Sequence, residues 1–171
     1  MKLTRNILIL MAGLSLAACT DPGRFSGGTG AGGAGAGSGA IVPGSANDPT
    51  STAYFNQTVG DRVLFAVDES VISEEGKIVL NGQADWLANN VEFTAVIEGH
   101  ADEQGTREYN VALGARRANA VREYLVSRGV AGNRLQTVSY GKERPIEICS
   151  SEDCYAKNRR AVTLLAGGLS G

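Results

Sequence analysis

The chain has 171 residues, of which 43% are hydrophobic and 20% charged, and its formal net charge is −2. This composition is that of a globular protein with enough apolar residues for a core and no excess of basic residues. Because such a charge gives no electrostatic reason to bind a phosphate backbone, nucleic acid is excluded as a partner.

Residues 1–18 have the pattern of an export signal. Lys2 and Arg5 precede a short apolar run, which does not reach the roughly 20 residues that span a bilayer. The segment ends in "LAAC" and resembles the lipobox of bacterial lipoproteins. The resemblance implies cleavage before Cys19, acylation of Cys19 and, with Thr20 rather than aspartate next, sorting to the outer membrane. The alternative is a chance cysteine after an ordinary signal peptide.

Residues 19–58 are predicted to be a flexible tether behind the lipidated cysteine. Nine of the seventeen residues from 23 to 39 are glycine, and Pro43 and Pro49 extend the irregular composition. Without the signal, the chain carries 14 Lys and Arg against 18 Asp and Glu, a net charge of −4. The remainder, residues 59–168, is long enough for one domain with a single core.

Strand and helix patterns alternate along this domain. Ser73, followed by Glu74 and Glu75, is typical of a helix start, and Gly129 is typical of a helix end. The predicted elements are a strand at 62–67, a helix at 74–90, a strand at 92–99, a helix from about 106 to 128, and strands at 134–141 and 159–166. This order predicts an α/β domain of the α+β sandwich type, with a small four-stranded mixed sheet and two main helices packed on one face.

Four separated stretches carry a family resemblance. "LFAVDES", "GHADEQGTREYNVALGARRANAVREYL", "VSYGKERP" and "KNRRAV" resemble the OmpA-like peptidoglycan-binding domain, of βαβαββ topology, as it occurs in the peptidoglycan-associated lipoproteins of the Tol–Pal system. The resemblance implies a protein of the outer membrane that faces the periplasm. It implies noncovalent binding to the diaminopimelate of the peptidoglycan stem peptide, which tethers the outer membrane to the cell wall.

The same resemblance implies what this protein works with. Its partners would be peptidoglycan, outer-membrane lipid through acylated Cys19, and Tol-system proteins such as TolB, in a role in envelope integrity and cell division. It implies neither enzymatic activity nor a cofactor or metal.

The chemistry of diaminopimelate suggests which side chains bind it. Its free end carries an ammonium and a carboxylate, so a receptor should offer one acid and one guanidinium. By resemblance, Asp102 and Arg117 are this pair. Spacing alone places Asp102 in a loop and Arg117 on a solvated helix face, roughly 16 Å along a helix that begins at Thr106. The pair can meet only if the loop folds back over the helix.

The resemblance adds four further ligand-binding candidates: Asp68, Thr106, Leu113 and Arg159. Asp68 follows a strand and could equally cap the next helix or hold the loop. Arg159 and Arg160 alternate across a strand, so at most one of them faces the pocket. Gln104 departs from the family pattern, in which arginine is common, and this weakens the case for a second cationic contact.

The only histidine raises the alternative of a periplasmic hydrolase or metalloenzyme that acts on cell-wall fragments. His100 and Asp102 are two residues apart, but the sequence offers no further ligand at an HExxH or CxxC spacing and no nucleophile paired with a base. We expect the His100 ring to be hydrogen-bonded into its loop, with direct contact to a ligand as the alternative. A third function that stays open is a lipoprotein that binds only other proteins.

Cys149 and Cys154 lie together between the third and fourth predicted strands. In an oxidising periplasm they are expected to form a disulfide, with two free thiols as the alternative. Closing so short a loop contributes roughly 2 kcal/mol at most, so the bridge is a local staple.

Overall fold

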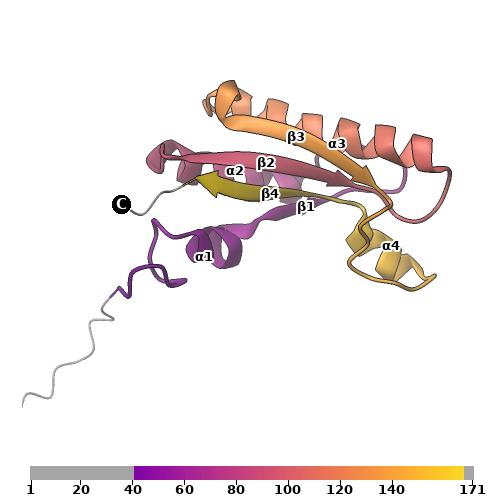
Figure 1. Ribbon diagram of the computed structural model, residues 1–171, viewed down its shortest axis with the longest axis horizontal. Helices are drawn as coiled ribbons and strands as arrows, with labels where there is room; N and C mark the ends of the chain where they lie inside the picture. The colour runs from indigo at the N-terminus through magenta and orange to yellow at the C-terminus, as the bar shows by residue number, and fades with distance from the viewer. Residues whose placement is uncertain (1–40, 168–171) are drawn as a thin grey trace, which may run out of the picture. The chain divides into compact units, whose positions relative to one another are not determined.

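The computed structural model describes residues 41–167 (Figure 1). The predicted signal peptide, Cys19 and the tether up to residue 40 lie outside the described residues. The elements in chain order are α1 (Thr52–Tyr54), a π-helical turn η1 (Phe55–Gly60), β1 (Arg62–Leu64), α2 (Glu74–Asn89), β2 (Phe93–His100), α3 (Arg107–Ser127), a 3₁₀ turn η2 (Gly132–Arg134), β3 (Leu135–Gly141), α4 (Glu152–Asn158) and β4 (Arg160–Gly167).

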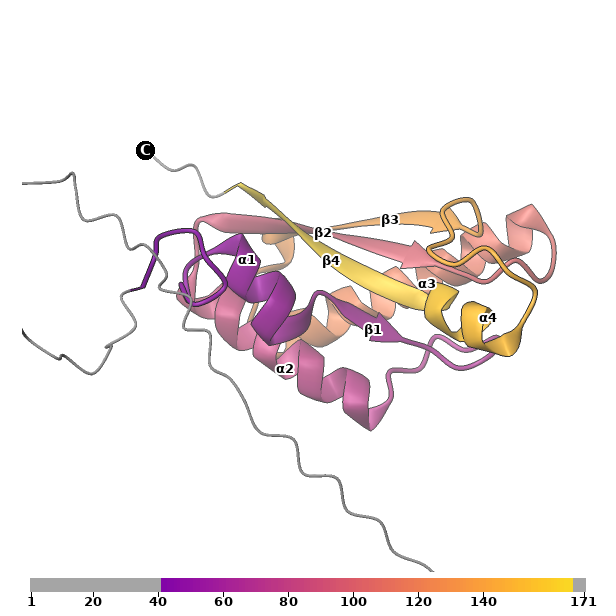
Figure 2. The ribbon, with the colours of Figure 1, turned by 90° about the horizontal axis from the view of Figure 1, so that it is seen from below.

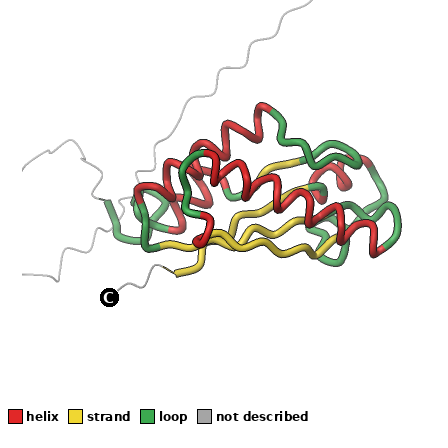
Figure 3. Tube along the Cα trace, turned by 90° about the horizontal axis from the view of Figure 1, so that it is seen from above, coloured by secondary structure: helices red, strands yellow, loops and turns green. Residues whose placement is uncertain are grey.

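The four strands form one mixed sheet in the order β1-β4-β2-β3. Strand β4 is antiparallel to both β1 and β2, whereas β2 and β3 are parallel and are joined by α3, the kind of crossover that parallel strands need. Helices α2 and α3 lie on the same side of the sheet (Figures 2 and 3). The predicted fold is thus confirmed.

The predicted elements and the observed ones differ mainly where elements are short. Ser73 caps α2 as expected, since its Oγ accepts a hydrogen bond from the Gly76 amide at 3.1 Å. Strand β1 ends at Leu64 rather than at residue 67, and the chain then enters a turn at which Asp68 has a positive φ of +58°. Helix α4 was not predicted, since seven residues are too few for a helical period to be visible.

The folded domain begins before the predicted boundary. Phe55 is fully buried, and its ring and that of Phe93 both lie 5.0 Å from the ring of Trp86. The Trp86 Nε1 donates a hydrogen bond to the Pro49 carbonyl at 2.8 Å. The predicted end of the tether at residue 58 is therefore wrong, because the apolar residues just before it complete the core.

Two glycines set helix α3 against strand β2. A Cβ at Gly99 would overlap the carbonyl oxygen of Gly114, and a Cβ at Gly114 would lie 2.8 Å from the carbonyl oxygen of Gly99. The two backbones can come this close only because both residues lack a side chain. This contact fixes where the first half of α3 lies relative to the end of β2.

Candidate ligand-binding site

A cavity of about 190 Å³ opens at the end of the sheet where β1 and β2 finish. Both strands run antiparallel to β4, so the loops that follow them leave the sheet at the same end. The walls come from the loop after β1, from the loop after β2 (residues 101–106, called here the ligand loop) and from the first turns of α3. The lining residues are Val67, Asp68, Asp102, Gln104, Gly105, Tyr109, Asn110 and Leu113.

The start of α3 holds the ligand loop in place. Thr106 is the N-cap, and its Oγ1 accepts a hydrogen bond from the Tyr109 amide at 3.2 Å. One turn later, the Asn110 side chain donates to the Gln104 carbonyl at 2.7 Å, across the glycine at 105, whose φ is +90°. The loop is therefore folded back against the helix, as the proximity of Asp102 to the helix requires.

Asp102 lies at the back of the cavity with both oxygens engaged. Its Oδ1 accepts a hydrogen bond from the Gln104 amide at 3.2 Å, and its Oδ2 accepts one from Arg159 Nη1 at 3.1 Å. Arg159 is itself buried, donates to the Phe65 carbonyl at 3.2 Å and also pairs with Glu152. A carboxylate held in this way keeps its position when a ligand enters.

Arg117 does not lie on a solvated helix face. Its side chain is fully buried, and its guanidinium donates to the carbonyl oxygens of Glu69 at 2.8 Å, His100 at 2.8 Å and Ala66 at 3.1 Å. The first and third of these carbonyls belong to the loop after β1, and the second immediately precedes the ligand loop. Arg117 thus joins the two loops that form the cavity.

Burial also changes the pKa of Arg117. Loss of solvent lowers the pKa of the guanidinium to about 10, and the nearby Asp102 carboxylate opposes this decrease. The group stays protonated at neutral pH, so a positive charge lies behind a cavity whose wall carries acids.

Asp68 supplies the second carboxylate from the opposite wall. It is the one non-glycine residue of the described chain with a positive φ, at +58°, a conformation that aspartate and asparagine tolerate better than most residues. The Tyr109 hydroxyl donates a hydrogen bond to its carboxylate. Asp68 therefore neither caps α2 nor continues β1, but faces the cavity.

The six predicted ligand-binding residues thus fall into three groups. Asp68, Asp102 and Leu113 line the cavity, while Arg117 and Arg159 lie behind it and hold its loops. Thr106 caps α3 and is absent from the cavity wall. Sequence reasoning did not identify five lining residues: Val67, Gln104, Gly105, Tyr109 and Asn110.

A signal for two of these residues was present in the sequence. Tyr109, Asn110 and Leu113 follow the N-cap at spacings that place them on one side of the helix, and Arg117 continues that side one turn later. Val111, between these residues in the chain, lies on the other side of the helix and is exposed.

His100 differs from expectation. Its ring is 2% exposed, yet neither ring nitrogen has a hydrogen-bond partner within residues 41–167. Burial, followed by the charges of Arg160 and Arg144, lowers the pKa of His100 to about 4. The Glu98 carboxylate lies 3.5 Å from its Nε2, and the Tyr140 ring centroid is 5.7 Å away. The ring is therefore neutral at neutral pH and is not hydrogen-bonded into the loop.

Two further features of the described residues bear on the site. Among residues 41–167, no group of three or more His, Cys, Asp or Glu side chains is placed to hold a metal ion. In the same range, no helix combines the length and apolar content that crossing a membrane requires.

Comparison with known proteins places these features in a family. Residues 64–159 match the model of the OmpA family. The chain is 48% identical over 167 residues to the peptidoglycan-associated lipoprotein of Mesorhizobium japonicum, a match that covers 96% of this chain and 95% of the relative.

Solved structures agree with that result. The crystal structure of the peptidoglycan-associated lipoprotein from Burkholderia pseudomallei matches with a TM-score of 0.63 and 35% identity, over 70% of this chain and 98% of that one. The C-terminal domain of Helicobacter pylori MotB, 23% identical with a TM-score of 0.59 over 63% of this chain and 85% of its own, shares the fold.

Proposed function

Because the chain belongs to the OmpA family and, within it, to the peptidoglycan-associated lipoproteins, we propose that it binds peptidoglycan noncovalently, with diaminopimelate of the stem peptide in the cavity beside α3. One observation carries the proposal: the carboxylates of Asp68 and Asp102, from loops that follow two different strands, converge on a cavity of about 190 Å³. In this proposal the protein is a binding protein and not an enzyme.

The cavity suits a ligand that is a zwitterion on a short apolar stem. Asp68 and Asp102 attract an ammonium group, while Val67 and Leu113 provide apolar contact for methylene groups. The buried charge of Arg117 behind the wall offsets the two acids and favours a ligand that also carries a carboxylate. The free end of diaminopimelate has these three features.

The remaining parts of the proposed function rest on the sequence. Acylated Cys19 attaches the protein to outer-membrane lipid, with the domain facing the periplasm, and the segment between them reaches the cell wall. Membership of the family supports a place in the Tol–Pal system, with Tol proteins such as TolB as partners.

Co-sedimentation with purified peptidoglycan sacculi tests the proposal, with Asp68→Asn as the sharpest variant. Asparagine tolerates the positive φ at this position, so the substitution removes a charge without adding strain. A charge-assisted hydrogen bond contributes about 1.5–3 kcal/mol, so the variant should bind sacculi at least about tenfold more weakly. Asp102 is less suitable, because its loss also removes one of the hydrogen-bond partners of buried Arg159.

Glu123→Gln is the matched control, since it removes one exposed carboxylate from the later half of α3 and should bind like the parent. Free diaminopimelate should displace the parent from sacculi. Equal binding by Asp68→Asn and the parent would refute the proposed cavity. Soluble fragments released from the sacculi would instead indicate a hydrolase, and a parent that does not sediment would indicate a lipoprotein that binds only proteins.

A further inference from the structure

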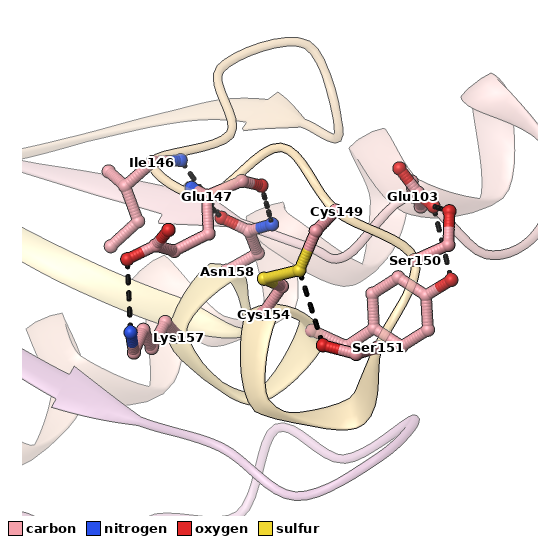
Figure 4. The surroundings of a disulfide bond; sticks show 10 residues. Glu103, Ile146, Glu147, Cys149, Ser150, Ser151, Cys154, Lys157 and Asn158 are labelled. Atoms are coloured by element: carbon pink, nitrogen blue, oxygen red, sulfur yellow. Dashed lines mark hydrogen bonds and ion pairs between the residues drawn. A yellow bond between two sulfur atoms is a disulfide. The ribbon is translucent and has the colours of Figure 1, made fainter.

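The segment closed by the disulfide contacts the ligand loop. Cys149 and Cys154 are bonded, with their Cα atoms 5.9 Å apart, and the segment from Cys149 to Tyr155 is called here the disulfide segment. Its Ser150 hydroxyl and its Tyr155 hydroxyl both donate to Oε1 of Glu103, each at 3.1 Å (Figure 4). Glu103 is the residue next to Asp102 in the ligand loop.

A second connection reaches Asp102, the residue before Glu103 in the ligand loop. Arg159, directly after α4, pairs through one nitrogen with Glu152 of the disulfide segment and through another with Asp102. Two consecutive residues of the ligand loop, Asp102 and Glu103, are therefore held from the same side. No residue of the disulfide segment lines the cavity.

Both donors lie next to the bonded cysteines in the chain. Ser150 follows Cys149 in the chain, and Tyr155 follows Cys154, so each hydroxyl that reaches Glu103 sits next to one bonded cysteine. Helix α4 has seven residues, too few to be stable without tertiary support. Its far end is anchored separately, because the Asn158 side chain accepts from the amides of Ile146 and Glu147 at 2.9 and 3.2 Å (Figure 4).

From this arrangement we propose that Glu103 is a positioning residue of the cavity, and that the Cys149–Cys154 bridge acts through it to set ligand affinity. This rests on the proposed function, because it concerns the same cavity. The bridge keeps the Ser150 and Tyr155 hydroxyls on Glu103, and Glu103 in turn keeps the Asp102 carboxylate at the cavity wall. The bridge thus does more than staple a surface loop, the role that its short span alone predicts.

The test compares three variants with the full-length parent: Cys149→Ser with Cys154→Ser, Glu103→Ala, and the combination. Each of the first two should weaken binding to sacculi by about three- to tenfold, the range for loss of ordinary hydrogen bonds. The combined variant should bind sacculi no more weakly than whichever of the first two variants binds more weakly, because both changes break the same connection. Should the serine pair fail to fold, an alanine pair carries the same comparison with Glu103→Ala.

Glu147→Gln is the matched control. The substitution removes the 3.0 Å ion pair between Glu147 and Lys157, which lies in the same stretch of chain. Because it breaks no contact with the ligand loop, the variant should bind sacculi like the parent. Thermal unfolding, measured alongside, separates a loss of affinity from a loss of folded protein.

Amide hydrogen exchange distinguishes a bridge that orders the ligand loop from one that only stabilises the domain. The Gln104 amide, which donates to Asp102, should exchange faster in the cysteine variant, while that of Ile97 in the middle of β2 should not change. Parental affinity in the cysteine variant, or fully additive losses in the combination, would overturn the inference. If the parent itself does not bind sacculi, the proposed function fails, and exchange at Gln104 still decides whether the bridge orders the loop.

Discussion

Replacing Arg117 with alanine should destabilise the domain rather than simply weaken ligand binding. The substitution removes three donors that satisfy the carbonyl oxygens of Ala66, Glu69 and His100. A buried acceptor left without a partner costs about 1–3 kcal/mol, and water that enters the vacated space recovers part of this. The expected loss is about 4 kcal/mol, a large share of the roughly 5–15 kcal/mol by which a domain of this kind is stable.

Urea unfolding followed by the fluorescence of Trp86, the only tryptophan, measures this loss. With a slope of about 2 kcal/mol/M, a change of about 4 kcal/mol moves the midpoint by about 2 M. Arg116→Ala is the matched control on the preceding residue. The Arg116 side chain is exposed, with its guanidinium 5.9 Å from the Tyr109 ring centroid, so its loss should cost less than about 1 kcal/mol.

Arg117→Lys separates charge from geometry. An ammonium keeps the positive charge but cannot span three carbonyl groups that a planar guanidinium reaches, so it should recover at most about half of the stability. The reasoning is refuted if Arg117→Ala unfolds within about 1 kcal/mol of the parent and yet binds sacculi tenfold more weakly. In that case the guanidinium would be a ligand-binding group, as the family resemblance implies.

Three further predictions concern other parts of the chain. His100 has a pKa of about 4 when folded against 6.5 when unfolded, so its contribution to stability is fully present above pH 6.5 and falls by about 3 kcal/mol as the pH drops to 4. Urea titrations at several pH values should show that the free energy of unfolding falls more steeply with decreasing pH in the parent than in His100→Phe. The same dependence on pH in both proteins would contradict the prediction. Gly99→Ala should cost about 3 kcal/mol by thermal unfolding, because its Cβ would overlap the Gly114 carbonyl, and an unchanged melting temperature would disprove the close approach. Cys19→Ser should leave the protein in the soluble periplasmic fraction, and its retention in membranes of cells that lack the Tol partners would argue against the lipid anchor.

The sequence predicted the long elements well because each has a period that shows in the pattern of apolar residues. The limits of β2, β3 and β4 lie within one residue of those expected, and Ser73 and Gly129 mark the helix ends as their chemistry requires. The short elements α1, η1 and α4 were missed. They are held by a disulfide and by packing of residues such as Phe55, and neither leaves a local period.

The sequence by itself determined the fold class and the pairing partners available to the cysteines, because these depend on residue type and order, whereas the two acids of the cavity were implied only by the family resemblance. Only the tertiary structure decided which side of α3 faces inward. The contact between Gly99 and Gly114 sets the rotation of that helix, and with it Arg117 turns to the backbone of two loops instead of to solvent. Charge alone predicts exposure for an arginine, and that prediction is wrong wherever the fold brings enough carbonyl oxygens around the guanidinium to replace water.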